Sequence, residues 1–457
     1  MLQIDVHAIA SSAKFTGFHK LMLLICTLVI MADGYDIAVV GVALPSIMKD
    51  MGIASTVAGT MASASVFGMM IGAVLIGTLA ERMGRRRAIV ACLTLFSVGT
   101  AAAGLTHDTT SFCLVRFVAG IGIGGLMPCV VAQMAEFSPR DARATMITVS
   151  FGGFPIGGII AALTGKGLIE AYGWPSVFFA AAFPLLLVPF LLYSMPESMV
   201  FLVKRDRNEQ LRALLRRIDP SIRLDKNDVL VYATDVSRVR ANEHANTSQI
   251  FREGRALATS MFWLATFMCM FVMYGLIAWL VKIMSSAGYS LGSSLTFVIA
   301  LNLGALIGTI CAGRLGDRWP IRWVLCGLYL VASLGILMLS IKMPQLWLYV
   351  FIGLVGAGSY GGQNLTYAFA GQIYPLALRS IGVGWLAGVG RIGAITAPIL
   401  LGVLMTLRLP LEQNFIVIAV PMFLAAIAVT QIRATGTAPP LSGTRSSAEP
   451  VEQLAPK

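Results

Sequence analysis

Charged residues are scarce in this chain of 457 residues, and Asp, Glu, Lys and Arg together make up only 12% of it. A soluble domain carries about 25% charged residues, so the chain has roughly half of the ionic surface that it would need to face water. Apolar residues take their place, with 57% hydrophobic residues and a mean hydropathy of +0.80. This composition excludes a soluble globular protein and indicates an integral membrane protein.

Histidine and cysteine are also few. The four histidines, His7, His19, His107 and His244, are expected to lie outside the membrane, and the seven cysteines lie within apolar runs without the spacing of a disulfide framework or a metal site. No histidine stands near the nucleophile or metal set that a multi-pass acyl or glycosyl transferase would need, so a membrane enzyme is the remote alternative. We expect no metal, no cofactor and no enzymatic activity.

Apolar runs of about 20 residues, the length that spans a bilayer, occur twelve times. They cover residues 18–42, 57–80, 88–106, 111–135, 144–166, 174–194, 257–281, 291–313, 322–341, 346–370, 380–405 and 412–432. The first run is too long, and too poorly equipped with a cleavage site, for a removable signal peptide. The sequence therefore predicts an all-α membrane protein with twelve spans.

One long polar interruption divides these spans into two sets of six. We expect an N-terminal segment at 1–17, a six-helix bundle at 18–195, a central loop at 196–256, a second six-helix bundle at 257–432 and a disordered tail at 433–457. Within the loop, the Arg-rich amphipathic stretch 209–217 predicts a surface helix at the membrane interface.

The basic residues give the orientation, because Lys and Arg are retained on the cytoplasmic side. With both termini inside, the inner loops contain Arg82, Arg85 to Arg87, Arg140, Arg143, the cluster from Lys204 to Arg255, Arg314, Arg318 and Arg322, whereas the outer loops contain only Lys49, Lys166, Lys282, Lys342 and Arg408. The net charge of +12 follows from this asymmetry and does not indicate nucleic-acid binding. We expect a bacterial inner-membrane protein with cytoplasmic termini.

Two aspartates, Asp33 and Asp36, stand inside the first apolar run. A carboxylate at the middle of a bilayer costs roughly 2.5–3.5 kcal/mol on insertion scales, so a segment that keeps two of them is expected to use them. The other acidic residues fall in loops or at helix ends, and Glu136 is the nearest exception. We interpret Asp33, Asp36 and Glu136 as proton-coupling residues. The alternative for the aspartates is a structural pair that caps a helix break at Gly34.

Arg116 and Arg391 are the cations that lie away from the ends of the predicted spans. Arg116 is expected at the same depth in the bilayer as the two aspartates. This predicts an Asp–Arg pair between the first and fourth spans. Arg391 has no carboxylate at matching depth in its own half, so it is a candidate to bind an anionic substrate, and pairing with backbone carbonyls is the alternative. Further polar or aromatic residues within the second set of spans suit a ring with one polar end, although core filling is the default for each: Tyr274, Trp279, Asn302, Gln363, Asn364 and Tyr367.

A loop motif occurs twice at matched positions, after the second and the eighth spans. The copies read Gly77-Thr-Leu-Ala-Glu81-Arg82-Met-Gly84-Arg85-Arg86-Arg87 and Gly313-Arg314-Leu-Gly-Asp317-Arg318-Trp-Pro320-Ile-Arg322. They resemble the signature of the major facilitator superfamily, whose fold is two six-helix bundles around a central cavity. The resemblance implies a cytoplasmic latch of the acids and arginines that breaks and re-forms during alternating access. The chain departs from the signature at Glu81, where Asp is usual, and at Pro320, where Gly is usual.

A narrower resemblance covers almost the whole chain. It is carried by Asp33-Gly-Tyr-Asp36, by Ala132-Gln133-Met-Ala-Glu136-Phe-Ser-Pro139, by Met195-Pro-Glu-Ser198 and by Gly388-Val-Gly390-Arg391-Ile-Gly393. These motifs are similar to those of the aromatic acid:proton symporters, above all the benzoate and hydroxybenzoate carriers. The resemblance implies import of a small aromatic carboxylate together with protons, and we expect a monomer in the lipid bilayer. A proton-driven exporter of organic anions or drugs with the same fold is the alternative.

Overall fold

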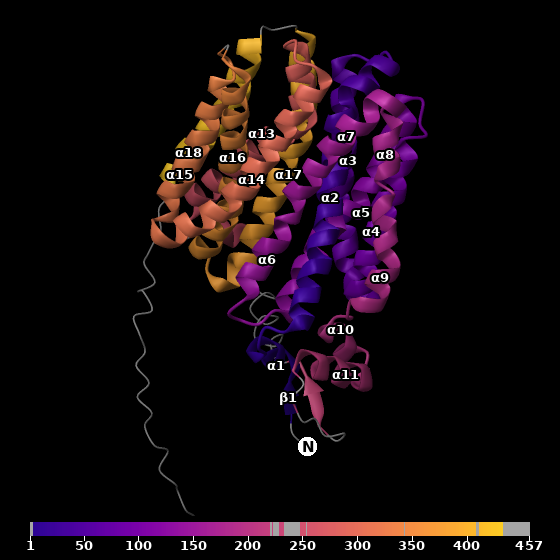
Figure 1. Ribbon diagram of the computed structural model, residues 1–457. Coiled ribbons are helices and arrows are strands. Elements are labelled where there is room, and N and C mark those ends of the chain that lie inside the picture. Colours follow the sequence, from indigo (N-terminus) through magenta and orange to yellow (C-terminus); the bar gives the residue numbers. More distant parts are fainter. Residues whose placement is uncertain are drawn as a thin grey trace, which may run out of the picture.

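The computed structural model describes residues 3–219, 222, 228–232, 247–252, 254–341, 343–407 and 411–432. Its long helices stand side by side in two groups that follow one another along the chain (Figure 1). The first group contains α2 (Gly17–Asp50), α3 (Ser55–Met83), α4 (Arg85–Ala103), α5 (Thr109–Phe137), α6 (Arg143–Phe151), α7 (Gly153–Tyr172), α8 (Pro175–Ala180), the 3-10 helix η1 (Phe183–Leu186) and α9 (Leu187–Ser194). The second contains α13 (Ala256–Ser286), α14 (Leu291–Arg318), α15 (Ile321–Met338), α16 (Gln345–Ile373), α17 (Leu376–Thr406) and α18 (Leu411–Gln431).

Eleven stretches of the described chain are long and apolar enough to cross a membrane, and they follow the order of the predicted spans. Two of them combine shorter helices, α6 with α7 and α8 with α9. Helix α16 is 29 residues long but is not among the eleven. Its sequence contains six glycines and the amides of Gln363 and Asn364, which lower its hydropathy. The count of twelve spans therefore stays a prediction.

Helix α2 differs from its predicted span at the far end. It is continuous from Gly17 to Asp50, eight residues beyond the predicted end at 42, and it contains Pro45. The helix break expected at Gly34 under the structural alternative is absent from α2. A Cβ added at Gly34 would lie 2.1 Å from the Phe154 carbonyl oxygen of α7, so the glycine serves close packing of two helices instead.

Three pairs of helices make the most extensive contacts between the two groups: α2 with α13, α3 with α17, and α7 with α14. In the first pair, a Cβ added at Gly41 would lie 1.8 Å from the Ile277 carbonyl oxygen. In the second, the Ser63 hydroxyl donates to the Ile395 carbonyl at 2.8 Å, and a Cβ at Gly59 would lie 2.4 Å from the Pro398 carbonyl oxygen. The backbones of the two groups are therefore in direct contact.

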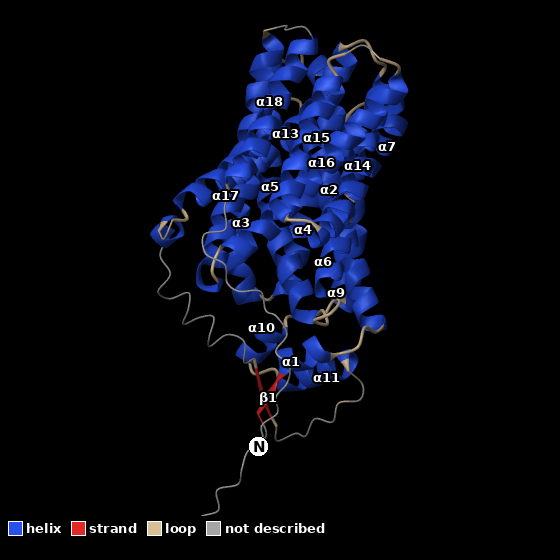
Figure 2. Ribbon diagram, turned by 90° about the vertical axis from the view of Figure 1, so that its left-hand side faces the viewer, coloured by secondary structure: helices blue, strands red, loops and turns tan. Residues whose placement is uncertain are grey.

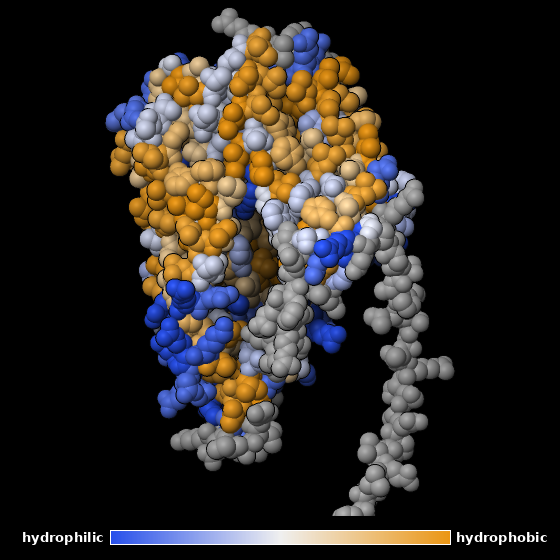
Figure 3. Space-filling view, turned by 180° about the vertical axis from the view of Figure 1, so that it is seen from behind, coloured by the Kyte–Doolittle hydropathy of each residue, from blue (hydrophilic) through white to orange (hydrophobic). Residues whose placement is uncertain are grey.

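These contacts gather toward one end of the molecule. The Ser63 and Gly41 contacts lie in the halves of their helices that are remote from the N-terminal segment, and we call this end the distal end and the opposite one the basal end. Toward the basal end a recess opens between the two groups on a surface otherwise covered by hydrophobic side chains, and hydrophilic residues gather at the basal end itself (Figure 3). The conformation is therefore closed at the distal end.

The N-terminal segment is folded, which the sequence did not predict. Strand β1 (Gln3–Asp5) pairs in parallel with β2 (Val229–Val231) from the central loop, and α1 (Val6–Ser12) follows it at the basal end (Figure 2). The loop also forms α10 (Met199–Lys204), α11 (Asn208–Ile218) and the 3-10 helix η2 (Thr247–Phe251).

Helix α11 matches the amphipathic helix predicted at 209–217, but its apolar face does not meet the lipid. Leu211, Leu214, Leu215 and Ile218 are buried, and α11 contacts α1, α2 and α10. Protein elements therefore cover its leucines, and its position at the membrane interface stays a prediction. The tail at 433–457, His244, Lys342 and Arg408 lie outside the described residues.

The closed distal end gives a first prediction. Replacing Gly41 by Ala puts a methyl group against the Ile277 carbonyl oxygen, so the two groups cannot approach as closely there. We expect the conformational equilibrium to shift away from distal closure. A single cysteine at position 63, otherwise buried between the groups, should then react severalfold faster with a thiol reagent in an otherwise cysteine-free protein.

Gly167→Ala is the matched control, because no atom lies within 4 Å of a Cβ at that position. Equal labelling rates in the two variants would show that the Gly41 contact does not limit closure.

Candidate functional site

A cavity of about 270 Å³ lies between the two groups of helices. Its walls come from α5, α6 and α7 on one side and from α13, α14, α16 and α17 on the other. The lining residues are Met127, Phe151, Phe154, Pro155, Met270, Met273, Tyr274, Ile277, Thr309, Tyr360, Gln363, Asn364, Tyr367, Ala387 and Arg391. A cavity just below the range typical for drug-sized ligands, with apolar walls and a few polar groups, suits a smaller organic molecule.

Helix α16 supplies the neutral polar part of the lining. Tyr360, Gln363, Asn364 and Tyr367 are spaced by three, four and seven residues, so they share one face of the helix. The Asn364 amide donates to the Thr309 hydroxyl at 3.3 Å. The buried Gln363 amide lies beside the Tyr367 hydroxyl, but neither of its polar atoms makes a well-formed hydrogen bond to any described residue. The amide groups of Gln363 and Asn364 are thus the hydrogen-bonding groups of this face that a bound molecule could reach.

Arg391 of α17 supplies the positive charge of the cavity. Its Nη1 atom is buried and has no hydrogen-bond partner among the described residues. No salt bridge to Arg391 forms within the described part of the chain either. A guanidinium without a counter-ion in an apolar cavity can bind a carboxylate through two parallel hydrogen bonds.

Two of the residues expected near a ring lie outside this cavity. Trp279 is completely buried, and its indole nitrogen donates to the Pro398 carbonyl at 2.9 Å, which joins α13 to α17. Asn302 donates to the Val298 carbonyl within its own helix, and its side chain packs against Gly158 where α7 meets α14. Both side chains therefore serve helix packing in this conformation, whereas Tyr274, Gln363, Asn364, Tyr367 and Arg391 line the cavity.

Asp36 and Arg116 form a buried ion pair inside the first group. The guanidinium donates to both carboxylate oxygens at 3.0 Å, and the two side chains are 1% and 0% exposed. Thr100 of α4 donates to Asp36 and accepts from Arg116 at 2.5 Å. The expected pair between the first and fourth spans is therefore present, with Asp36 as its acid.

Asp33 lies one helical turn from this pair and is equally buried. Neither of its carboxyl oxygens has a hydrogen-bond partner among the described residues. Arg391 and Asp36 both act on it electrostatically, but neither forms an ion pair with it. The two aspartates thus have different environments, although the sequence presents them as equivalent.

Glu136 lies at the basal end of α5. There it contacts the arginine-rich loop, by which we mean residues 84–87 between α3 and the first turn of α4. Arg85 forms a salt bridge with it, the Ser198 hydroxyl donates to it at 2.9 Å, and the Val200 backbone N–H donates to it at 2.9 Å. This cluster lies near the end of the helix, whereas Asp33 and Asp36 lie in the middle of α2. Glu136 thus pairs with a residue of the loop motif and lies apart from the two aspartates, and its proton-coupling role stays a prediction.

The sequence did not single out Glu197, which holds the same loop from the other side. Its carboxylate accepts from the Arg86 backbone N–H at 3.0 Å, and a Cβ added at Gly84 would lie 2.7 Å from that carboxylate. Gly84 also has a positive φ of 95°, which favours glycine. The Gln133 amide donates to the Pro196 carbonyl at 2.8 Å. The three motifs that contain Gly84, Glu136 and Glu197 therefore meet in one cluster.

The remaining residues of the expected latch are unpaired with one another in this conformation. Glu81, Arg82, Asp317 and Arg318 are exposed, and none of them forms a salt bridge within the described residues. Gly77 has no atom within 4 Å of its Cβ direction. The acid–arginine contact that is present, Arg85 with Glu136, joins α4 to α5 of the same group.

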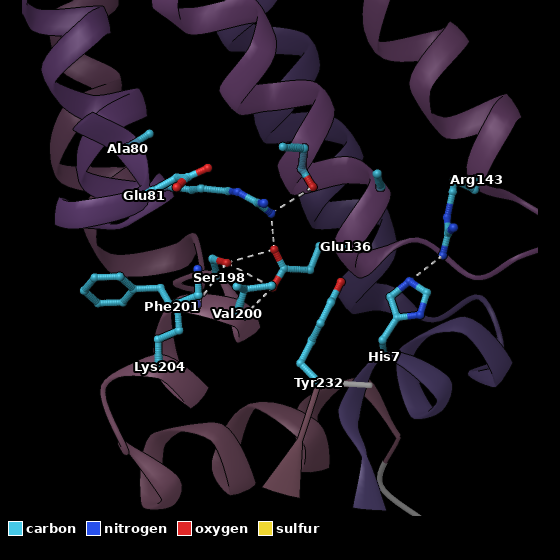
Figure 4. Close-up of a pocket in the computed structure, with 13 residues that line it drawn as sticks. His7, Ala80, Glu81, Glu136, Arg143, Ser198, Val200, Phe201, Lys204 and Tyr232 are labelled. Carbon is cyan, nitrogen blue, oxygen red and sulfur yellow. Dashed lines mark hydrogen bonds and ion pairs between the residues drawn. The ribbon is translucent and has the colours of Figure 1, made fainter. Parts of the chain in front are cut away.

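A second cavity, of about 360 Å³, lies beside this cluster at the basal end (Figure 4). His7 of α1, Arg143 of α6 and Tyr232 after β2 close one side of it, and Glu81, Glu136 and Lys204 line the other. The Arg143 guanidinium donates to the Ser11 hydroxyl at 3.1 Å, which ties α6 to α1. The N-terminal segment is therefore tied to α6, and the central loop is tied through Glu197 to the loop that begins α4.

The sequence missed the apolar part of the central cavity, because Met127, Phe154 and Met273 look like any other apolar residues of a membrane helix. Tyr360 carried a usable signal, since it stands three residues before Gln363 and seven before Tyr367 on the same helix face. Nothing in the sequence marked Thr309 as a residue that lines the cavity.

Comparison with known proteins agrees with this geometry. The family model described as the Major Facilitator Superfamily matches residues 26–365 and 300–456. The benzoate transport protein of Acinetobacter baylyi is 38% identical over 432 residues, which are 93% of this chain and 92% of that protein. The gentisate transporter of Corynebacterium glutamicum is 34% identical over 404 residues, which are 87% and 84% of the two chains.

Solved structures show the same fold at lower identity. The xylose transporter XylE from E. coli in its inward open conformation matches with a TM-score of 0.70 at 17% identity, covering 90% of this chain and 95% of that one. A bacterial homolog of the human lysosomal transporter Spinster matches with a TM-score of 0.69 at 16% identity, covering 91% and 97%. The predicted all-α membrane fold of two helix bundles is thereby confirmed.

The basal cluster gives a second prediction. Glu136→Gln removes the negative charge that Arg85 pairs with and weakens three hydrogen bonds around a side chain that is 1% exposed. Removing one partner of a buried polar contact costs about 1–3 kcal/mol, so we expect a clearly lower midpoint of thermal unfolding in detergent.

Glu81→Gln is the control for this measurement, because Glu81 lines the same cavity but is exposed and forms no salt bridge in the described structure. It should leave the midpoint within the error of the wild type. Equal loss in both variants would mean that the Arg85–Glu136 pair has no special part in stability.

Proposed function

The chain belongs to the Major Facilitator Superfamily, whose members are transporters and not enzymes, and within it we propose that the protein imports a small aromatic carboxylate together with protons by alternating access. The observation that carries the proposal is the unpaired guanidinium of Arg391 in a cavity between the two bundles. Relatives named as benzoate, gentisate and 4-hydroxybenzoate transporters support the substrate class.

The charge of such a substrate explains why proton coupling is needed. A benzoate-type acid resembles a Glu side chain, whose pKa is about 4.3, so it is almost wholly anionic near neutrality. Entry of an anion against an inside-negative potential costs about 2.3 kcal/mol per 100 mV for each charge. One accompanying proton cancels that cost, and a further proton makes the potential a driving force.

In the proposed complex the carboxylate pairs with Arg391, and the ring lies among the methionine and phenylalanine side chains of the cavity. The amides of Gln363 and Asn364 are available to a hydroxyl group on the ring. A site with such groups discriminates between ring substituents more strongly than an apolar wall does, because an unmatched buried amide costs free energy.

We further propose that the protein is a monomer in a bacterial inner membrane, with the basal end in the cytoplasm. The support is the gathering of arginines at the basal ends of α3 to α6, where Arg82, Arg86, Arg87 and Arg140 lie. The conformation closed at the distal end is then the inward-facing one.

Uptake of radiolabelled aromatic acids tests the proposed function. In a bacterial strain without carriers of its own, expression should give concentrative uptake of benzoate or a hydroxybenzoate that an inward proton gradient stimulates and a protonophore abolishes. Arg391→Ala should remove this uptake without lowering the amount of protein in the membrane. Arg391→Lys should show little uptake, because an ammonium group cannot form the two parallel hydrogen bonds of a guanidinium.

Arg379→Ala is the matched control, since Arg379 lies in the same helix but is exposed near its basal end. Wild-type uptake by Arg391→Ala would place the anion elsewhere. Efflux in place of uptake by the unmodified protein would favour the exporter.

The orientation is tested by thiol labelling of single cysteines at His107 and Lys204, two exposed positions at the distal and the basal end. In intact cells an impermeant reagent should modify position 107 only, because the basal end is expected to be cytoplasmic. Labelling of position 204 without lysis would reverse the proposed orientation.

A further inference from the structure

Two of the residues that line the central cavity carry buried polar atoms without a hydrogen-bond partner in the described structure. One is Arg391, through its Nη1 atom, and the other is Gln363, through both the oxygen and the nitrogen of its amide. The Gln363 side chain belongs to a residue that is only 3% exposed. The neighbouring Asn364 amide differs, because it donates to the Thr309 hydroxyl at 3.3 Å. Gln363 is therefore the neutral lining residue whose buried polar atoms lack a partner.

An amide in this position has a free-energy cost. A primary amide can both donate and accept hydrogen bonds, and burying it without either is unfavourable. The Gln363 amide lies beside the Tyr367 hydroxyl, but no well-formed hydrogen bond joins them. An apolar side chain of similar shape would fill the same space without this cost. The amide therefore indicates a polar partner that enters with the bound molecule.

Gln363 and Arg391 belong to the same bundle. Gln363 lies on α16 and Arg391 on α17, and these two helices contact each other. The side chains that the first group contributes to the lining are all apolar: Met127, Phe151, Phe154 and Pro155. The polar side chains that line the cavity thus come from the second bundle alone. A movement between the bundles therefore does not have to separate the partner of a carboxylate from the partner of a second polar group.

From these observations we propose that Gln363 determines the specificity of the cavity, and that the preferred substrate carries a ring hydroxyl as well as the carboxylate that pairs with Arg391. The hydroxyl can donate to the amide oxygen or accept from the amide nitrogen. The inference rests on the proposed function and deepens it, because it names the substituent that distinguishes the substrate from unsubstituted benzoate.

The position of the hydroxyl on the ring follows from its chemistry. A hydroxyl group next to the carboxylate donates to the carboxylate of its own molecule, so it is not available to Gln363. The hydroxyl that Gln363 recognises is therefore in the meta or the para position.

Displacement of water explains why the substituent matters. A ring without a hydroxyl displaces water from the amide and puts no hydrogen-bonding group in its place, which lowers the affinity. A ring with a hydroxyl restores the lost hydrogen bond. A hydrogen bond to a buried neutral group changes an affinity by about tenfold.

Binding of substituted benzoates to the purified full-length protein tests the proposal. Acids with the same substitution pattern separate hydrogen bonding from size: 3-hydroxybenzoate with 3-methylbenzoate, and 4-hydroxybenzoate with 4-methylbenzoate. In at least one of these pairs, titration calorimetry should show about tenfold tighter binding of the hydroxylated acid. Gln363→Leu should remove this preference, because leucine offers no hydrogen bond to the hydroxyl.

The protein and the ligands each offer a matched control. Gln372→Leu should keep the preference, because Gln372 lies on the same helix but is exposed and does not line the cavity. The affinity for 2-hydroxybenzoate should not fall in Gln363→Leu, because its hydroxyl is bonded to its own carboxylate. Loss of the preference in Asn364→Leu together with its retention in Gln363→Leu would overturn the assignment.

The remaining outcomes separate the inference from the function on which it rests. Equal affinity for both acids of each pair, or a preference that persists in Gln363→Leu, overturns the inference and leaves the proposed function intact. Absence of binding of all these acids by the unmodified protein overturns the proposed function as well. Gln363→Met takes the place of Gln363→Leu if the leucine variant does not fold, because methionine is unbranched and adapts to irregular space.

Discussion

A charge buried in a membrane protein needs a counter-charge at hydrogen-bonding distance. The two buried arginines of this molecule differ in whether they have one. In the first bundle Arg116 and Asp36 satisfy each other completely, with Thr100 as a third partner. In the second bundle Arg391 lines a cavity with a free nitrogen. An incomplete match in a low-dielectric interior is unfavourable, so its persistence indicates a site that something else completes.

The division of labour between the bundles follows from the same constraint. The mid-membrane carboxylates, Asp33 and Asp36, belong to the first bundle, whereas Arg391 and the amides of α16 belong to the second. The Asp36–Arg116 pair lies wholly within the first bundle, so the proposed rocking of one bundle against the other need not disturb it.

Much of the architecture could be predicted from the sequence, because a membrane helix must be apolar over its whole length and that requirement is visible residue by residue. The ends of the helices were less visible, as α2 shows by continuing through Pro45 to Asp50. The strand pairing of β1 with β2 could not be predicted, because three-residue strands that are more than two hundred residues apart have no periodicity to read.

The site was only partly predictable for a related reason. Polarity within an apolar run marks a residue as exceptional, and this signal found Arg391, Gln363 and Asp36. It does not tell which side of the helix the residue faces, so Trp279 and Asn302 carried the same signal although they bond to backbone carbonyls outside the cavity.

The cluster at the basal end has a consequence for the motion of the first bundle. Glu136 and Glu197 hold the arginine-rich loop between α3 and α4 against α5 and the segment before α10. These contacts lie within one bundle, so they can persist while the other bundle moves. In the proposed alternating-access cycle, the exposed acids and arginines of the two loop copies would be available for contacts between the bundles: Glu81, Arg82, Asp317 and Arg318. A loop held from behind by Glu136 and Glu197, with its charged edge exposed, would suit such closure, because only the edge would have to find a partner.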